Sequence, residues 1–209
     1  MLKKEHIAAK VFRDLSWHFT GKDNELFLTF DDGPTPEITP WVLSCLKEFD
    51  AKATFFCIGK NVKKHPELYK QILDEGHSVG NHTQNHNKGW FTRNKGYVQG
   101  VRNAAEVIDS NLFRPPYGKI RPKQITYLKK DFKIIMWDVL TKDYNRKLDK
   151  EKCLKHALDH TESGSIIVFH DILKAEKNLK YVLPQFLKHF SDLGYIFNPI
   201  EFKTSSFFK

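Results

Sequence analysis

The chain has 209 residues, of which 40% are hydrophobic and 28% are charged, as in globular proteins and unlike disordered or fibrous ones. This length suits one domain with a real core rather than two ordinary domains, and no run approaches the 18 apolar residues of a membrane-spanning helix. The 34 Lys and Arg residues outnumber the 25 Asp and Glu residues, and the formal net charge of +9 would attract a polyanion. Three cysteines are too few, and odd in number, for a disulfide scaffold.

The N-terminus begins like an export signal but does not continue as one. Residues 1–4 are basic, yet Lys10 interrupts the apolar run that should follow, and no small-residue cleavage site is present. We expect a short amphipathic helix within an N-terminal extension covering residues 1–23, followed by one domain in residues 24–209. With no signal peptide visible, the sequence by itself points to the cytoplasm but leaves the compartment open, because a chain trimmed of its leader would look the same.

Short apolar runs typical of strands alternate with helical patterns from residue 24 onward. The predicted strands cover 26–30, 53–58, 77–80, 111–114, 132–139, 165–169 and 195–198. The predicted helices begin at Thr39 as the N-cap of Pro40, run from Pro66 to Gly76, and lie near 96–110, 122–130, 149–161 and 176–193. This alternation, without a linker or repeat, indicates a single α/β domain with a parallel sheet and leaves open whether the sheet is closed.

Five polar clusters directly follow predicted strands. In parallel α/β folds the carboxyl ends of the strands share one edge of the sheet, where active sites are built. We therefore expect the five clusters to meet at one mouth. They are Asp31-Asp32-Gly33-Pro34, His82 with His86, Arg114-Pro115-Pro116-Tyr117-Gly118, Trp137-Asp138 with Asp143, and His170-Asp171.

The first two clusters contain the residue types of a metal site. The adjacent carboxylates of Asp31 and Asp32 repel each other unless a cation or a donor lies between them, although an ordinary Asp-Gly-Pro turn also explains them. His82 and His86 are four residues apart, which would place both imidazoles on one face of a helix. One carboxylate with two imidazoles suits Zn²⁺ and leaves a fourth position for water.

The same residue types also have ordinary structural explanations. His156 and His160 repeat the four-residue spacing inside an amphipathic helix, and we expect that pair to lie at the surface. Arg114 precedes a rigid Pro-Pro turn, where it is placed either to pair with a carboxylate at a neighbouring strand end or simply to face solvent. His170 ends an apolar run, where a core histidine is the ordinary interpretation. Each motif taken singly is therefore insufficient.

Together, in order and spacing, the clusters resemble the motifs of the polysaccharide deacetylases of carbohydrate esterase family 4, also called the chitooligosaccharide deacetylase homology domain. The matching segments are TFDDGP at 29–34, HTQNH at 82–86, RPPYG at 114–118, WDVLTKDY at 137–144 and IIVFHD at 166–171. This resemblance implies a distorted (β/α) barrel of about seven parallel strands, with the catalytic domain in residues 24–209. It also implies metal-dependent hydrolysis of the N-acetyl group of N-acetylglucosamine-type saccharides, such as a chitin oligomer or peptidoglycan, with release of acetate.

The resemblance further implies a division of labour within the site. Asp32, His82 and His86 would hold a divalent metal, usually zinc in this family. Asp31 would be the general base and His170 the general acid. Amide hydrolysis needs both, because water must lose a proton as it attacks and the amine leaves poorly unless it is protonated.

Further residues would support these groups. By the family pattern, Arg114 would orient and ionise the general base, Asp143 would tether the general acid with Asp138 as the fallback, and the Tyr117 backbone N–H would stabilise the oxyanion. The chain departs from the family pattern at Leu140, Tyr144 and Val168, which would reshape the walls of the groove and so affect the choice of substrate.

Three alternatives follow from the same residues. An O-acetyl esterase or a non-sugar amidase would use the same apparatus, and a catalytically silent domain would bind metal or glycan without turnover. The positive charge alone points to nucleic acid, but no recognition motif, basic helix or basic tail accompanies it. The lysines are spread over helices and loops, so we expect no nucleic acid as a partner. The resemblance implies an acetylated saccharide instead.

Overall fold

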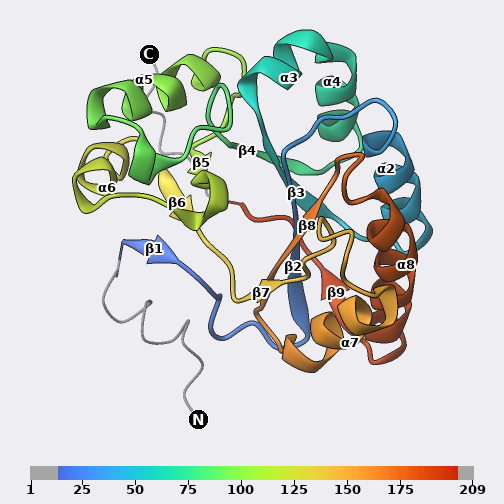
Figure 1. Cartoon of the computed structure of the whole chain (residues 1–209). Helices are drawn as coiled ribbons and strands as arrows, with labels where there is room; N and C mark the ends of the chain where they lie inside the picture. The colour runs from blue at the N-terminus through green and yellow to red at the C-terminus, as the bar shows by residue number, and fades with distance from the viewer. Residues whose placement is uncertain (1–13, 202–209) are drawn as a thin grey trace.

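The computed structural model describes residues 14–201, which form one curled sheet with helices packed around it (Figure 1). The strands are β1 Leu15–Ser16, β2 Glu25–Asp31, β3 Ala53–Cys57, β4 Ser78–Asn81, β5 Leu112–Phe113, β6 Lys133–Ile135, β7 Val139–Leu140, β8 Ile166–His170 and β9 Ile196–Phe197. The helices are α2 Thr39–Glu48, α3 Gly59–Lys64, α4 Pro66–Asp74, α5 Asn94–Ala105, α6 Pro122–Leu128, α7 Lys150–His160 and α8 Glu176–Asp192, with 3₁₀ turns η1 Gly89–Phe91 and η2 Pro116–Gly118. The helix predicted near the N-terminus lies outside the described residues.

All the strand pairs in the sheet are parallel. The strand order is β1-β6-β5-β4-β3-β2-β8-β7, and β9 pairs with the start of β2. The central strand β2 places Asp31 beside Phe56 of β3 and beside His170 of β8. Because the strands are parallel, their carboxyl ends gather at one edge, and the predicted distorted (β/α) barrel is confirmed. The sheet is open, with β1 and β7 at its two ends, which the sequence had left undecided.

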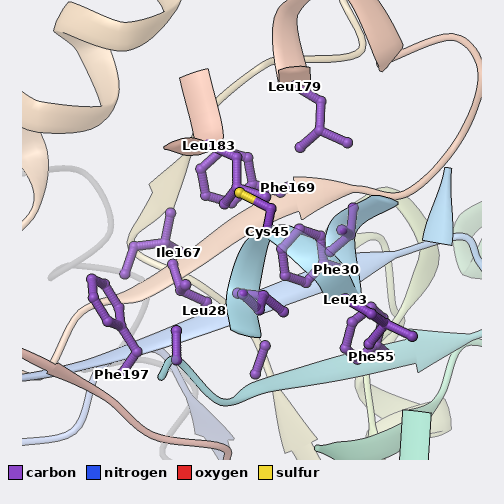
Figure 2. Packing of buried hydrophobic residues seen from close by; sticks show 14 of the residues in the cluster. Leu28, Phe30, Leu43, Cys45, Phe55, Ile167, Phe169, Leu179, Leu183 and Phe197 are labelled. Carbon is purple, nitrogen blue, oxygen red and sulfur yellow. The ribbon is translucent and has the colours of Figure 1, made fainter. Parts of the chain in front are cut away.

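The core lies between the central strands and helices α2 and α8 (Figure 2). Phe30 of β2 stacks on Phe55 of β3 with ring centroids 5.0 Å apart, and on Phe169 of β8 at 5.8 Å. Leu43 of α2 and Leu183 of α8 are fully buried against this layer. These apolar contacts fix the strands whose ends carry the polar clusters, since interiors pack too densely to let them shift.

Three predictions about the elements were wrong. The single strand predicted at 132–139 is two strands, because Met136–Asp138 leave the ladder and β7 then pairs with β8 instead of β5. Helix α3 was not predicted. Thr39 is the first residue of α2 rather than its cap, and its hydroxyl donates to Asp171 Oδ2 at 2.5 Å.

Two expectations from composition are confirmed within the described residues. The cysteines Cys45, Cys57 and Cys153 are all buried and form no disulfide. Along residues 14–201, no helix combines the length and the apolar character needed to cross a bilayer.

A candidate active site at the carboxyl ends of the strands

One cavity of about 390 Å³ gathers residues from all five predicted clusters. Its volume is within the range of small-molecule sites in proteins. The residues that line it are Asp31, Asp32, His82, His86, Tyr117, Trp137, Leu140, Tyr144, Val168, His170, Ile172 and Lys174. The convergence expected from parallel strand ends therefore occurs.

Asp32, His82 and His86 converge on a single point. Asp32 Oδ1 lies 2.9 Å from Nε2 of His86 and 3.4 Å from Nε2 of His82, and one ligand atom from each residue lies within 4.8 Å of the others. Nevertheless, this buried Oδ1 makes no hydrogen bond of good geometry with any described residue. A carboxylate oxygen left unsatisfied between two imidazole nitrogens is the arrangement expected of ligands around a cation.

The charge of Asp32 suits a ligand. Burial favours the neutral carboxyl, but the imidazoles of His82 and His86 outweigh burial and hold the pKa of Asp32 well below its ordinary value. His82 Nδ1 lies 2.8 Å from the carbonyl oxygen of Arg114. Because a carbonyl only accepts, Nδ1 carries a proton, and Nε2 is the ring nitrogen left to bind a metal.

The two histidines are not on a helix, so the helical-face prediction was wrong. They lie in a turn after β4 in which Thr83 and His86 have φ of 65° and 56°. Asn81 holds this turn: its Oδ1 accepts from the Thr83 N–H at 2.8 Å and its Nδ2 donates to the Val101 carbonyl at 2.8 Å. Residues with positive φ cannot continue an α-helix. Here the chain reverses direction in the turn after β4, and this reversal brings the two imidazoles together.

The turn that presents Asp32 is also unusual. Asp32 has φ 82°, and its carbonyl accepts from Asn61 Nδ2 at 2.8 Å. The next residue must be glycine, because a Cβ on Gly33 would collide with the carboxylate of Asp171. Burial, the largest cause, raises the pKa of Asp171 to about 8, and this carboxyl joins the β2–α2 loop to the end of β8 through Thr39.

Asp31 is held by a fully buried arginine. Arg114 Nη1 donates to Asp31 Oδ1 at 2.8 Å and to Thr29 Oγ1 at 2.6 Å. Its other nitrogens donate to the carbonyls of Ile135 at 3.3 Å and Met136 at 2.9 Å. Burial, only partly offset by Asp31, lowers the pKa of Arg114, but a guanidinium remains charged at any ordinary pH. The pair is therefore a fixed carboxylate and cation with its hydrogen bonds satisfied.

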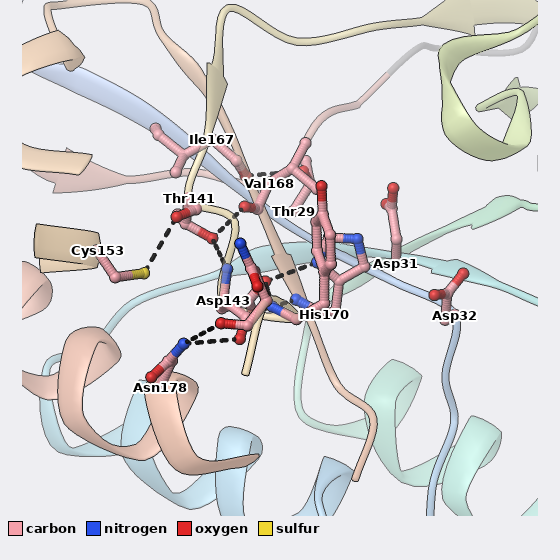
Figure 3. Close-up of polar contacts among 12 residues, drawn as sticks. Thr29, Asp31, Asp32, Thr141, Asp143, Cys153, Ile167, Val168, His170 and Asn178 are labelled. Carbon is pink, nitrogen blue, oxygen red and sulfur yellow. Dashed lines mark hydrogen bonds and ion pairs between the residues drawn. The ribbon is translucent and has the colours of Figure 1, made fainter. Parts of the chain in front are cut away.

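His170 is held by Asp143, which contacts it twice (Figure 3). His170 Nδ1 lies 2.8 Å from Asp143 Oδ1, and the His170 backbone N–H donates to Oδ2 at 2.8 Å. Burial lowers the pKa of His170, but the charge and hydrogen bond of Asp143, with help from Asp31 and Asp32, raise it to about 9. His170 is therefore a protonated imidazole near neutral pH that lines the cavity.

Asp138, the fallback tether, does not contact His170. Its Oδ2 lies 2.8 Å from His18 Nδ1 and accepts from Ser165 Oγ at 2.9 Å, while its Oδ1 accepts from the Ile166 N–H at 2.7 Å. These contacts lie at the amino-terminal end of β8. Of the two carboxylates that the sequence left open, Asp143 is the one beside the imidazole.

His156 and His160 behave differently from the pair in the cavity. They lie on α7, with His156 partly buried and His160 exposed, and His160 Nδ1 lies 2.8 Å from the His156 carbonyl. Among residues 14–201, neither belongs to a group of three side chains that could hold a metal. The surface position predicted for this pair is confirmed for His160, while His156 is only partly exposed.

Tyr117 lies in η2 at the mouth of the cavity. It has φ 60° and is half exposed, and its ring centroid is 4.6 Å from that of His86. Gly118, with φ 63°, follows it, and a Cβ there would lie 2.8 Å from Trp137. Tyr117 is among the residues that line the cavity.

Several side chains around the cavity were not identified from the sequence. Thr29 bonds to Arg114, and Asn178 of α8 donates to the Asp143 carbonyl at 3.2 Å. Lys174 lines the cavity from the loop before α8. Thr29 and Asp31 are two residues apart on β2 and so point to the same face of the sheet, which could have identified Thr29 from the sequence. No sequence pattern identifies Asn178 or Lys174, because only the folded chain brings them to the site.

The chain is similar to several characterised proteins. A family model described as polysaccharide deacetylase matches residues 19–133. A peptidoglycan-N-acetylglucosamine deacetylase of Bacillus cereus is 34% identical over 164 residues, which cover 74% of this chain and 59% of that protein. Another protein of the same name and organism is 30% identical over 191 residues, which cover 88% of this chain and 89% of that protein. The crystal structure of a peptidoglycan N-acetylglucosamine deacetylase in complex with 4-naphthalen-1-yl-N-oxidanyl-benzamide has a TM-score of 0.81 at 28% identity, with 92% and 94% of the two chains covered.

Proposed function

Because the chain belongs to the polysaccharide deacetylase family, we propose that it hydrolyses the N-acetyl group of N-acetylglucosamine-type saccharides and uses a divalent metal, zinc, to do so. One observation carries the proposal: Asp31 and His170 face the same cavity as the converging Asp32, His82 and His86. A base, an acid and a metal site within one cavity are what amide hydrolysis requires.

The residues present suit a metal. Asp32 Oδ1 is buried and unsatisfied among the described residues, and Nδ1 of His82 is turned to the Arg114 carbonyl, which leaves Nε2 to bind a metal. Asp32, His82 and His86 would hold the ion and leave room for water and substrate. When bound, the ion supplies a Lewis acid that polarises the acetyl carbonyl and makes water easier to deprotonate.

Asp31 is suited to accept a proton from the attacking water. Its partner Arg114 carries a permanent positive charge, and its Nη1 lies 2.8 Å from Asp31 Oδ1. The guanidinium is held by Thr29 and two carbonyls, so it orients Asp31 without moving. We assign Asp31 as the general base and Arg114 as its positioning residue.

His170 is suited to give a proton to the leaving amine. With a pKa of about 9 it is protonated near neutral pH, and Asp143 fixes Nδ1 so that Nε2 is the nitrogen available for donation. The backbone N–H of Tyr117, a residue that lines the cavity, would donate to the oxyanion of the tetrahedral intermediate, a contribution of about 3–4 kcal/mol in comparable sites.

Acetate release from N-acetylated oligosaccharides tests the proposal, with Asp31→Asn as the matched control. We expect zinc-loaded protein to release acetate, a chelator to abolish release and added zinc to restore it. Asp31→Asn should retain the metal but lose about 10²- to 10⁴-fold in rate, because it removes only the base.

Three outcomes would contradict this function. Equal acetate release by wild type and Asp31→Asn would exclude Asp31 as the base. Release from O-acetylated substrates alone would indicate an esterase. Glycan binding without release of acetate from any acetylated saccharide would indicate a silent domain.

A further inference from the structure

The net positive charge of the protein comes from two stretches of the chain. Lysines occur throughout the sequence, but residues 76–105 and 110–130 contain no Asp or Glu. The two stretches hold ten of the 34 Lys and Arg residues and none of the 25 Asp and Glu residues, so the rest of the chain is almost neutral. The ten are Lys88, Arg93, Lys95, Arg102, Arg114, Lys119, Arg121, Lys123, Lys129 and Lys130.

The fold places these two basic stretches against each other. Helices α5 and α6, one from each stretch, lie side by side on one flank of the molecule (Figure 1). The turn η1 of the first stretch is fixed on the second: the Gly89 N–H donates to the Lys119 carbonyl at 3.1 Å, and Trp90 Nε1 donates to the Ile120 carbonyl at 3.2 Å. The Arg121 guanidinium in turn donates to the Trp90 carbonyl. The charges of both stretches therefore belong to one surface.

Most of these cations are not neutralised by the protein. Only three of the ten form ion pairs within residues 14–201, namely Arg102, Arg114 and Lys129. The other seven are the exposed Lys88, Arg93, Lys95, Arg121, Lys123 and Lys130 and the partly exposed Lys119. This surface therefore offers several cations to an external anion, and such charges attract it over a distance.

The same surface carries the exposed aromatic side chains. Within residues 14–201, every exposed Phe, Trp or Tyr lies in one of the two basic stretches, and these residues are Trp90, Phe91, Tyr117 and Tyr127. Phe91 is 78% exposed, more than any other large hydrophobic side chain of that range. Lys119 Nζ lies 5.1 Å from the ring centroid of Trp90, so a cation and an exposed ring are neighbours. Exposed apolar groups among cations mark a surface for a partner that is both anionic and apolar.

The polar groups of η1 are already satisfied, as entry into an apolar layer requires. The Trp90 indole N–H and carbonyl are bonded to Ile120 and Arg121, as described above. The Phe91 N–H donates to the Lys88 carbonyl at 3.1 Å, and the Gly89 carbonyl accepts from Gln124 Nε2 at 2.9 Å. The turn can therefore bury its two rings without leaving these donors and acceptors unpaired.

An anionic bilayer fits these features better than a soluble polyanion or the substrate. Trp and Phe enter the boundary between lipid headgroups and acyl chains, while Lys and Arg bind anionic headgroups. A soluble polyanion would need the cations but not the most exposed ring, that of Phe91. Neither Trp90 nor Phe91 lines the cavity of the candidate active site, so a saccharide bound there does not account for them.

We propose that residues 88–95 and 119–123 form a docking surface for a bilayer that contains anionic phospholipid, with Trp90 and Phe91 entering at the level of the headgroups. Tyr117, in the second basic stretch, lines the cavity, so docking brings the mouth of the cavity close to the bilayer. The inference goes beyond the proposed function and does not depend on which reaction the site performs.

Sedimentation of the full chain with vesicles of phosphatidylcholine, with and without phosphatidylglycerol, tests the surface. We expect the protein to bind the vesicles that contain phosphatidylglycerol, and to bind them less as ionic strength rises. Phe91→Ser should weaken binding about tenfold and Lys95→Gln about fivefold, since one removes a buried ring and the other a cation near the surface. The matched controls Leu193→Ser and Lys177→Gln alter an exposed leucine and an exposed lysine outside the two stretches and should bind like wild type.

Tryptophan fluorescence distinguishes entry into the bilayer from adsorption by charge alone. Brominated acyl chains should quench the emission of vesicle-bound wild type, and Trp90→Phe should remove that quenching. Equal binding to both kinds of vesicle, or full binding by Phe91→Ser and Lys95→Gln, would overturn the proposal. Salt-sensitive retention of nucleic acid without binding to vesicles would also overturn it and would assign the surface to a soluble polyanion. None of these measurements involves acetate release, so they stand apart from the test of the proposed function.

Discussion

Asp31 and Asp143 are two buried carboxylates, each 2.8 Å from a cationic partner, yet the pairs differ in what they can do. The partner of Asp31 is Arg114, which keeps its proton at any ordinary pH. The partner of Asp143 is His170, which can give its proton away. The comparison shows that the choice of cation, rather than the carboxylate or its depth, separates a fixed pair from one that transfers protons.

The supports of the two pairs are alike. Thr29 Oγ1 donates to the Ile167 carbonyl at 2.8 Å and accepts from Arg114. Thr141 Oγ1 donates to the Val168 carbonyl at 2.8 Å and accepts from the Asp143 N–H at 3.4 Å. Each pair is thus supported by a threonine whose hydroxyl donates to a backbone carbonyl of β8. The difference in chemistry between the pairs arises from the cationic partner of each carboxylate.

Arg114→Met breaks the fixed pair and should have the largest effect. It leaves Asp31 buried without its cation, so we expect a loss of about 3–5 kcal/mol in the free energy of unfolding, measured by urea denaturation. The double variant Asp31→Asn/Arg114→Met should recover part of that loss, since no buried charge is left alone. Equal stability of the single and double variants would show that the pair is not coupled.

Asp143→Asn changes the proton-transferring pair without emptying the site. It removes the main cause that raises the pKa of His170, so burial, opposed only by the charges of Asp31 and Asp32, should bring that pKa down from about 9. NMR titration of the imidazole in the metal-free protein measures this shift. Deacetylation at neutral pH should fall about 10²-fold, because the acid is then largely unprotonated. An unchanged titration would exclude Asp143 as its cause.

The pH dependence of stability should distinguish the two pairs in the metal-free protein. The pKa of His170 is higher in the folded state, about 9, than the ordinary value of 6.5, so its stabilising contribution is complete below pH 6.5 and is lost as pH rises through 9. Arg114 gives no such change in this range. Unfolding measured across that window should therefore show a decrease in wild type that is smaller in Asp143→Asn.

The threonine supports should have the smallest effects, and these should be unequal. Thr29→Val leaves a buried guanidinium with one hydrogen bond fewer and should cost about 1–3 kcal/mol. Thr141→Val removes a longer, neutral contact and should cost about 0.5–1.5 kcal/mol. Thermal or urea unfolding measures the loss of stability in both variants. A larger loss for Thr141→Val than for Thr29→Val would contradict the expected order.

The convergence of the clusters could be predicted from the sequence because parallel strands end at one edge. This rule places Asp31 and His170 at the same edge, since each directly follows a predicted strand. That the two strands are neighbours in register is known only from the structure. The sequence left Asp138 and Asp143 as alternatives because both follow the same apolar run. Only the break of that run into β6 and β7 directs Asp143 toward His170 and Asp138 away from it.

The conformation around His82 and His86 could not be predicted from their spacing. The spacing of four residues suggested a helix. In the structure, the hydrogen bonds of Asn81 hold a turn in which Thr83 and His86 have left-handed backbone angles. The local sequence pattern therefore indicates which residue types follow a strand, while contacts with distant parts of the chain decide how those residues are arranged.

The site depends on four residues with left-handed backbone angles, namely Asp32, Thr83, His86 and Tyr117. Each such residue costs about 1–3 kcal/mol, so these loops do not adopt their shapes by their own preference. A synthetic peptide spanning His82 to His86 would not gather its imidazoles, and grafting the motif onto a helix would keep the residues but lose their convergence. The cavity exists only as long as the barrel around it does.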